Sequence, residues 1–311
     1  MSVFPMLLSS FLRPAGLFLV SSLTLLGQPA GKSMSMQARV LRMTEFLETI
    51  LPGTLGAKNV TLHFTPKFSD FRDEQYTRYP VEVRYGVNDR LDLSAGIVPF
   101  APNPFRSGSG VDHRWGLGEF RFGGRYDIGS LGFFDDTTIG LENRIPLGKP
   151  PIGLNDHYTH VKPFLALART LKIWPDTTFY TNLSYDRSVI LTRRDPPPPT
   201  VIRRHVIDVW PGMLFKPSEL GYFAEYRFSH ITEPLDWHYG HELRFGTIWD
   251  VPIESSEKWK LPGKWQVELA YRITHEEGYD SNHGIFARVN WRTTLREVLD
   301  PSSKPATARR R

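Results

Sequence analysis

The feature that most constrains this fold is a set of segments in which apolar and polar residues alternate. Roughly twelve such segments can be marked between about residues 58 and 293. In one of them, Val81, Val83 and Tyr85 alternate with Glu82 and Arg84. Successive side chains of a strand point to opposite faces, so each segment has one apolar face and one charged face.

The connections between these segments alternate between long and short. A barrel that crosses an outer membrane has tight turns at one end and long loops at the other, and its strands exceed the roughly five or six residues usual in soluble sheets. The sequence therefore predicts an all-β fold, an antiparallel up-and-down transmembrane β-barrel of about twelve strands over residues 58–293, with both termini at the short-turn end. The predicted short connections lie near 86–90, 129–135, 172–176, 216–219 and 251–263, and the long ones near 69–78, 101–115, 147–159, 190–201, 231–238 and 275–283.

The ends of the chain predict three further segments. Arg13 precedes an apolar run over 15–26, which is too short for a spanning helix and typical of a signal peptide, so residues 1–31 are predicted to direct export. Residues 36–51 have helical spacing and predict a short N-terminal helix within a periplasmic segment, 32–57. Residues 294–311 are polar and basic and are predicted to be disordered. Cysteine is absent, which excludes disulfides and cysteine metal sites.

Tryptophans gather at the ends of the predicted strands. Trp115 and Trp237 lie beside long connections, and Trp174, Trp249, Trp259, Trp265 and Trp291 lie at the other end. Two such groups are typical of the aromatic girdles that mark the two membrane interfaces. The predicted location is therefore the outer membrane, with its lipid and the barrel-assembly machinery as partners. The chain continues past Trp291, whereas outer-membrane barrels usually finish on a terminal aromatic residue.

Two stretches carry a family resemblance. Residues 83–93 read VRYGVNDRLDL and residues 116–126 read GLGEFRFGGRY. Together they resemble outer-membrane barrels of the meta-pathway phenol-degradation transporter type, with Asp92 and Glu119 in the acidic places of the two motifs. The resemblance covers residues 80–129. It implies a bacterial channel-like or transporter-like barrel that passes small, often aromatic or apolar, molecules.

Charged residues on the polar faces are predicted to point into the lumen, because Arg or Lys on the lipid face costs roughly 2–4 kcal/mol at the membrane midplane. Two interpretations remain open: a polarised constriction that selects cargo, or a structural ion-pair network that fills the barrel. The candidates are Glu82, Arg84, Arg90, Asp92, Glu119, Arg121, Arg125, Asp127, Glu142 and Arg144.

Other function classes have weaker support. Acidic and basic residues are interleaved, which disfavours nucleic-acid binding, and no cofactor motif is present. His157 with His160, and His238 with His241, are three residues apart and would point to opposite faces of a strand, so no metal site is predicted.

Two alternatives to a channel remain. One is an outer-membrane lipid-hydrolysing enzyme that uses His275 and Ser281, although the spacing of these residues does not match a known nucleophile motif. The other is a soluble exported protein with a lipocalin-like cavity. We expect no enzymatic activity.

Overall fold

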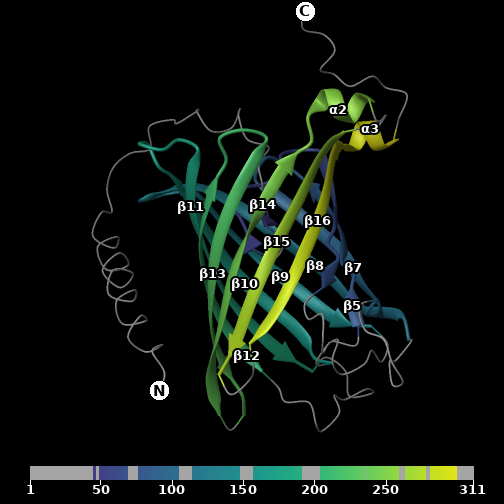
Figure 1. Cartoon of the computed structure of the whole chain (residues 1–311), viewed down its shortest axis with the longest axis vertical. Helices are drawn as coiled ribbons and strands as arrows, with labels where there is room; N and C mark the ends of the chain where they lie inside the picture. The colour runs from purple at the N-terminus through teal and green to yellow at the C-terminus, as the bar shows by residue number, and fades with distance from the viewer. Residues whose placement is uncertain are drawn as a thin grey trace, which may run out of the picture.

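A computed structural model of the chain describes residues 45–46, 49–68, 76–104, 114–147, 157–190, 204–234, 236–258, 263–277 and 281–299. Its main feature is an antiparallel sheet of fourteen strands that closes on itself. Figure 1 shows the strands tilted about a common axis. The predicted signal peptide, residues 1–31, lies outside the described residues.

Two barrel strands are interrupted by proline. β3 and β4 form one strand broken at Pro66, and β5 and β6 form the next, broken at Pro80, so the fourteen strands make a barrel of twelve. The strands are β3 (Asn59–Phe64), β4 (Lys67–Phe68), β5 (Tyr76–Arg78), β6 (Val81–Gly86), β7 (Leu91–Pro102), β8 (Gly116–Leu131), β9 (Phe134–Pro146), β10 (Thr159–Thr170), β11 (Thr177–Val189), β12 (His205–Phe215), β13 (Leu220–Thr232), β14 (Trp237–Asp250), β15 (Lys264–Glu276) and β16 (Asn282–Thr294).

The barrel closes because the last strand pairs with the first. β16 runs antiparallel to β3, with Trp291 opposite Leu62, and also pairs with β4. The remaining strands pair with their neighbours in chain order, which is the up-and-down arrangement. The predicted twelve-strand, all-β barrel is confirmed, and the predicted alternation of short and long connections holds as far as residue 219. It fails in the last three connections, because 233–236 and 277–281 are short where long loops were predicted and 251–263 is long where a turn was predicted. The 251–263 connection is long for a turn because it contains a helix, α2 (Ile253–Lys258).

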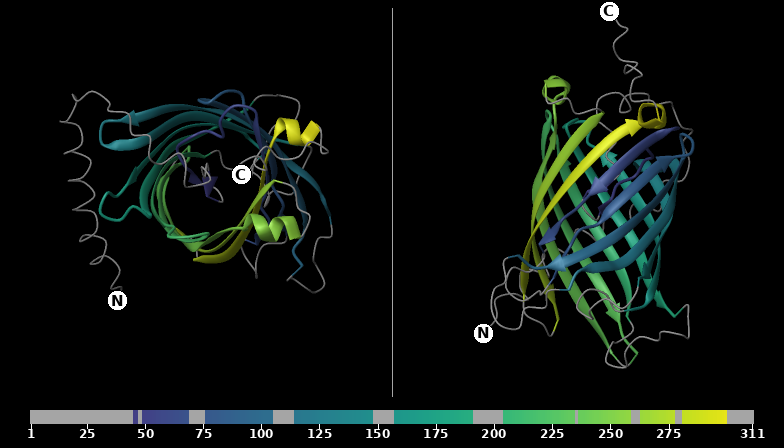
Figure 2. Two further views of the ribbon diagram at one scale, coloured as in Figure 1. Left: turned by 90° about the horizontal axis from the view of Figure 1, so that it is seen from above. Right: turned by 90° about the vertical axis from the view of Figure 1, so that its right-hand side faces the viewer.

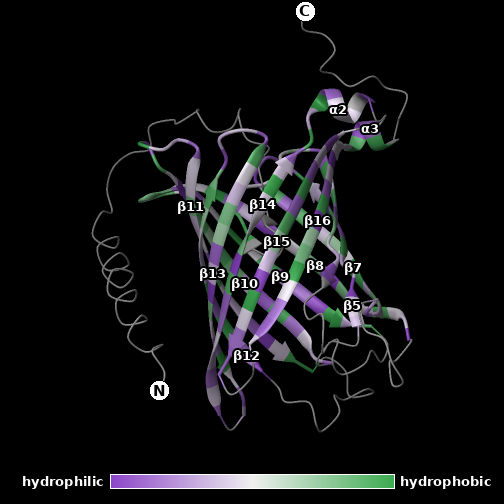
Figure 3. Ribbon diagram, in the orientation of Figure 1, coloured by the Kyte–Doolittle hydropathy of each residue, from purple (hydrophilic) through white to green (hydrophobic). Residues whose placement is uncertain are grey.

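The two faces of the wall have opposite chemistry. Leu93 on β7 is 50% exposed, whereas its neighbour Asp92 is 1% exposed. The same inversion recurs around the barrel, and Figure 3 shows apolar and polar colours alternating along the strands. An apolar outer surface and a polar interior suit a barrel surrounded by lipid, because the bilayer solvates the outer side chains and the lumen holds the charges.

Aromatic residues mark the two ends of the outer surface. Trp265 and Trp291 stack at the short-turn end with ring centroids 6.1 Å apart, and Trp237 packs against Tyr239 at the other end with centroids 5.2 Å apart. The positions of these tryptophans agree with the predicted girdles, and Trp259 lies outside the described residues. Along β14, the twelve residue steps from Trp237 to Trp249 cover roughly 40 Å of strand, or about 30 Å of height at the usual tilt.

The segment before the barrel lies inside it. β1 (Glu45–Phe46) and β2 (Thr49–Ile50) form a small hairpin, and Figure 2, viewed from above, places it within the ring of strands. The helix predicted over 36–51 is therefore wrong where this region is described, since these residues pair as strands. Its helical spacing is a short apolar pattern that a lumen hairpin also satisfies. Residues 36–44 lie outside the described part.

The predicted disordered tail begins with a helix, α3 (Leu295–Leu299), so the boundary at residue 294 was wrong. The Thr294 hydroxyl accepts the backbone N–H of Glu297, and the Glu297 carboxylate accepts the backbone N–H of Thr294. This reciprocal capping box holds the first turn. The Thr293 hydroxyl and the Thr294 backbone N–H both donate to the Glu297 carboxylate, and these bonds lower the pKa of Glu297. Within the described residues, neither helix is long and apolar enough to cross a membrane.

The outer surface gives a first prediction. Leu243→Arg, in the middle of β14, should lower the free energy of unfolding by roughly 2–4 kcal/mol, because the guanidinium would enter the hydrocarbon. Leu131→Arg is the matched control beside a short turn, where the cost falls to roughly 0–1 kcal/mol. Denaturant titration in lipid vesicles measures both variants. Equal costs for the two would contradict the assigned lipid-facing surface.

Candidate functional site

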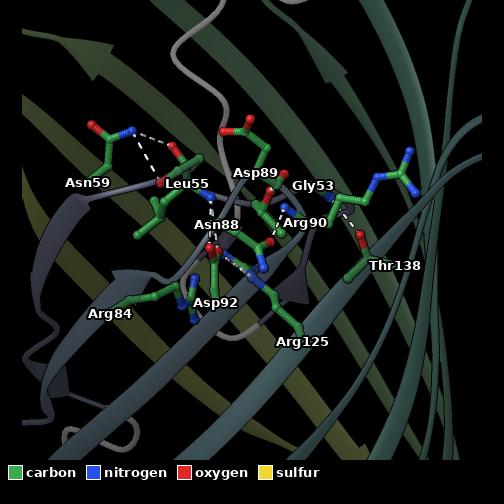
Figure 4. A network of polar contacts seen from close by, with 12 residues as sticks. Gly53, Leu55, Asn59, Arg84, Asn88, Asp89, Arg90, Asp92, Arg125 and Thr138 are labelled. Carbon is green, nitrogen blue, oxygen red and sulfur yellow. Dashed lines mark hydrogen bonds and ion pairs between the residues drawn. The ribbon is translucent and has the colours of Figure 1, made fainter.

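The lumen holds a short stretch of chain, residues 50–56, which we call the inner segment. Its polar anchor is Asp92 on β7: both carboxylate oxygens accept the backbone N–H of Leu55, at 3.1 and 2.9 Å. The N–H of Gly53 donates to the Thr138 hydroxyl at 2.7 Å, and the Arg292 guanidinium donates to the Leu55 carbonyl at 2.7 Å. Figure 4 shows the bonds of Gly53 and Leu55 converging on the wall. The inner segment is thus held by its backbone.

A close approach between the inner segment and the wall requires glycine at position 86. A Cβ placed on Gly86 would lie 1.9 Å from the carbonyl oxygen of Gly56. No side chain could occupy that space unless the inner segment moved. Gly86 belongs to the resembling motif, and its steric role is to admit residues 50–56 to the lumen.

The apolar side chains of the inner segment face a patch on the opposite part of the wall. Leu51 packs in one buried cluster with side chains from β10 to β16, and Ile50 packs with Phe164 and Ala166 on β10. This apolar patch consists of Ala168, Tyr180, Leu214, Phe223, Ile248, Ala270 and Phe286. The lumen therefore contains an apolar surface within an otherwise polar wall.

A first charge cluster lines strands β6 to β11. Arg125 pairs with Asp92 at 3.1 Å, and Arg84 pairs with Glu82 at 3.0 Å. Arg121 pairs with Glu119. The charges alternate in sign around the wall, so the cluster is an ion-pair network as well as a polarised surface.

The next pair extends the first charge cluster to β11. Arg144 pairs with Asp186, whose other oxygen lies 2.6 Å from His160 Nδ1. Asp186 and His160 were not among the predicted residues, although each lies in the expected alternation.

Most predicted lumen residues lie where the alternation places them. Arg90 does not: it is exposed in the 87–90 turn, where its backbone N–H donates to Asn88. Asp127 lies near the end of β8 and accepts the N–H of Gly129. Glu142 lines a small cavity between the inner segment and the wall, together with Ile50, Arg84, Asp92 and Arg125. The functional role of these residues remains a prediction.

A second charge cluster on β12 to β14 was missed as a site. Asp208 and Arg227 form a bidentate pair at 2.8 and 2.9 Å, and the Ser229 hydroxyl donates to Asp208 at 2.6 Å. Arg244 is 1% exposed and pairs with Glu242 and, at 3.7 Å, with Glu225. The period-two pattern placed Glu242 and Arg244 on a polar face, but the convergence of the cluster depends on how the barrel curves.

Aromatic rings from the apolar patch and β12 lie among the second cluster's cations. The guanidiniums of Arg227 and Arg244 each lie 4.8 Å from the ring centre of Trp210. The Tyr180 hydroxyl donates to Glu225 at 2.9 Å, and Arg272 lies 4.8 Å from the Phe286 ring. Such arrangements let a cation keep a favourable partner after it leaves bulk water. They also present aromatic faces and polar groups together in the lumen.

The other candidate residues are distributed between lumen and outer face. His238 faces inward and lies 2.7 Å from Glu276, whereas His241 faces outward and lies 2.6 Å from the Tyr226 hydroxyl. No group of three or more metal-binding side chains occurs among the described residues. The Ser281 hydroxyl does lie 3.2 Å from His275 Nδ1, and both side chains are exposed.

Comparison with known proteins gives matches among solved structures only. No protein-family model matches, and no curated protein matches. An outer-membrane channel from Pseudomonas putida F1 is 11% identical with a TM-score of 0.52, covering 78% of this chain and 97% of that chain. The NanC porin is 9% identical with a TM-score of 0.43, covering 75% and 98% respectively. The CymD monoaromatic hydrocarbon channel is 9% identical with a TM-score of 0.39, covering 76% and 87%.

At these identities the likeness concerns the fold. Taken with the closed twelve-strand wall and its apolar outer face, it defines an outer-membrane β-barrel.

The close approach at Gly86 gives a second prediction. Gly86→Ala should loosen the inner segment, because the added methyl would overlap the Gly56 carbonyl. Thr54 is fully buried and the chain has no cysteine, so a Thr54→Cys background reports accessibility through labelling with a water-soluble maleimide. We expect faster labelling in the Gly86→Ala variant.

The control for this experiment is Gly240→Ala on β14. The nearest atom to its added Cβ would lie 3.4 Å away, which is an ordinary contact. Unchanged labelling in Gly86→Ala, or an equal rise in Gly240→Ala, would show that Gly86 does not govern the position of the inner segment.

Proposed function

We propose that the protein is an outer-membrane channel for small molecules, with the inner segment narrowing the path. The observation that carries this proposal is the composition of the lumen wall. It combines paired charges with an apolar patch, and a short segment rests between them on a few hydrogen bonds. The fold that this chain shares with the Pseudomonas putida F1 outer-membrane channel supports the same function.

The pairing of the lumen charges suits the passage of small molecules through the barrel. A channel must attract its cargo enough to admit it and hold it weakly enough to release it. An unpaired buried Arg or Glu would bind an opposite charge tightly, because the lumen screens charge less than bulk water does. Pairs such as Asp92–Arg125 and Asp208–Arg227 leave local polarity without a strong net attraction.

The apolar patch supports a cargo of small aromatic or apolar molecules. Tyr180, Phe223 and Phe286 are buried in the cluster that contains Leu51 of the inner segment. If that segment moves away, these rings would offer apolar surface beside hydrogen-bonding groups, which fits small molecules with an aromatic or apolar body and a polar end. The resemblance of residues 80–129 to barrels of the meta-pathway phenol-degradation transporter type supports the same class.

Ion conduction tests the path. Asp92→Asn should raise single-channel conductance in a planar bilayer, because a neutral amide would hold the Leu55 N–H less strongly and the inner segment would leave the lumen more often. Asp127→Asn is the control, since the Asp127 carboxylate accepts the N–H of the nearby Gly129 and not an N–H of the inner segment. Heat-modifiable gel migration checks that both variants are folded.

Uptake by vesicles tests the cargo. Relative to protein-free vesicles, the protein should increase the entry rate of phenol more than that of a sugar alcohol of similar mass. If neither the variants nor wild type conduct ions, and the protein does not increase phenol entry, the lumen is closed and the channel proposal fails.

One observation favours an enzymatic alternative, the hydrogen bond between Ser281 and His275. Such a bond is what a nucleophile and its general base require. This alternative predicts slow release of fatty acid from phospholipid in mixed micelles, lost in Ser281→Ala. The described residues place no third group on His275 Nε2, so we expect wild type and Ser281→Ala to show the same background rate. Hydrolysis that requires Ser281 would contradict that expectation.

A further inference from the structure

The outer face of β13 to β16 carries an unusual group of histidines. Between the girdles, the outward positions of these four strands contain no Lys, Arg, Asp or Glu. These positions do contain four histidines, whose side chains can also ionise, and all four lie toward the end of the barrel with the longer loops. They are His230, His241, His275 and His283. Ionisable side chains on a lipid-facing surface are costly and usually mark a function.

Three of these imidazoles are held in the same way. Tyr226 OH lies 2.6 Å from His241 Nδ1, Tyr271 OH lies 2.6 Å from His283 Nδ1, and Ser281 Oγ lies 3.2 Å from His275 Nδ1. A neutral imidazole has one donor and one acceptor nitrogen. When the hydroxyl donates to Nδ1, the ring proton must be on Nε2. Each histidine then presents an Nε2–H donor whose partner is absent from the described residues.

The register brings the three donors together. His241 and His275 are direct cross-strand partners, which places their Cβ atoms roughly 5 Å apart. His283 faces Ile273, two residues from His275, so it is the diagonal neighbour at roughly 7–8 Å. The donors therefore lie within reach of the several oxygens of one phosphate ester and its adjoining linkages.

The surroundings favour an anionic group over a metal ion. Each Nδ1 is already occupied by a hydroxyl, and no metal-binding group of three side chains occurs among the described residues. The carboxylate of the exposed Glu277 accepts the backbone N–H of Tyr239 at 3.4 Å. Trp237 and Tyr239 border the group and lie at the level of the lipid headgroups.

We propose that His241, His275 and His283 form a binding site for the phosphate of an outer-leaflet glycolipid of the lipid A type. In the orientation with the short turns in the periplasm, this end of the barrel meets the outer leaflet, where such phosphates lie. The imidazole Nε2–H groups donate to the charged phosphate oxygens, and a hydrogen bond to a charged acceptor is stronger than one to a neutral acceptor. The site is independent of whether the lumen conducts.

The test uses the full-length protein in dodecyl maltoside micelles, titrated with diphosphorylated lipid A and followed by calorimetry. Replacing two donors with rings of similar shape, in His241→Phe/His283→Phe, should weaken binding by roughly tenfold or more. Tyr226→Phe/Tyr271→Phe keeps both imidazoles and removes the hydroxyls that fix them, so a smaller loss is expected. His205→Phe is the control, an outward histidine on β12 beside Tyr185.

Titrations with other ligands distinguish the phosphate of a glycolipid from that of a phospholipid and from free phosphate. Fully dephosphorylated lipid A should bind much more weakly than the diphosphorylated form. Equal binding of these two, or unchanged binding in His241→Phe/His283→Phe, would overturn the site. Equal affinity for phosphatidylglycerol, or for inorganic phosphate, would overturn the assignment to a glycolipid. Gel migration confirms that each variant is folded.

Discussion

Closure of the sheet is the constraint on which the rest of this structure depends. A bilayer offers no water to unpaired backbone groups, so β16 must pair with β3 and leave no edge. The wall keeps this closure even where prolines cannot donate. Pro66, Pro80 and Pro99 lie on neighbouring strands, and each still accepts one bond, from Ala287, Thr65 and Tyr79 respectively. Register is preserved from β16 to β5, and a bulge absorbs the mismatch beside Pro99.

Closure also decides where charge must go. Once one face is committed to lipid, most Asp, Glu, Arg and Lys side chains of the strands are directed inward, where they are shielded from bulk water. A buried ion pair contributes little net stability, but an unpaired buried charge costs several kcal/mol. Nearly every strand of the wall accordingly contributes to an ion pair, and Asp92 has two partners, Arg125 and the Leu55 N–H. Asp92, which anchors the inner segment, is thus also one of the buried charges that the wall must pair.

The sequence predicts what repeats with a period of two and misses what depends on curvature. Strand number and the inward face follow from local alternation, which is why Glu82, Arg84 and Asp92 lie on the inward face as predicted. The position of Arg90 was wrong because turn residues escape the alternation. The second charge cluster required the register between β12, β13 and β14, since Asp208 and Arg227 meet across strands. The lumen hairpin was read as a helix because one set of apolar residues recurs at helical spacing: Val40, Met43, Leu47 and Ile50 or Leu51.

The inner segment joins two unlike halves of the wall. Its backbone is bonded to Asp92 and Thr138 on β7 and β9, and its apolar side chains pack against strands from β10 to β16. A hydrogen bond to a charged group contributes roughly 1.5–3 kcal/mol and a neutral one about 1 kcal/mol. The polar side of this attachment therefore amounts to a few kcal/mol, while the barrel wall holds a bonded pair at nearly every residue. The backbone pairs that close the barrel do not include the bonds of the inner segment, so we expect the barrel to stay closed when the segment leaves its place.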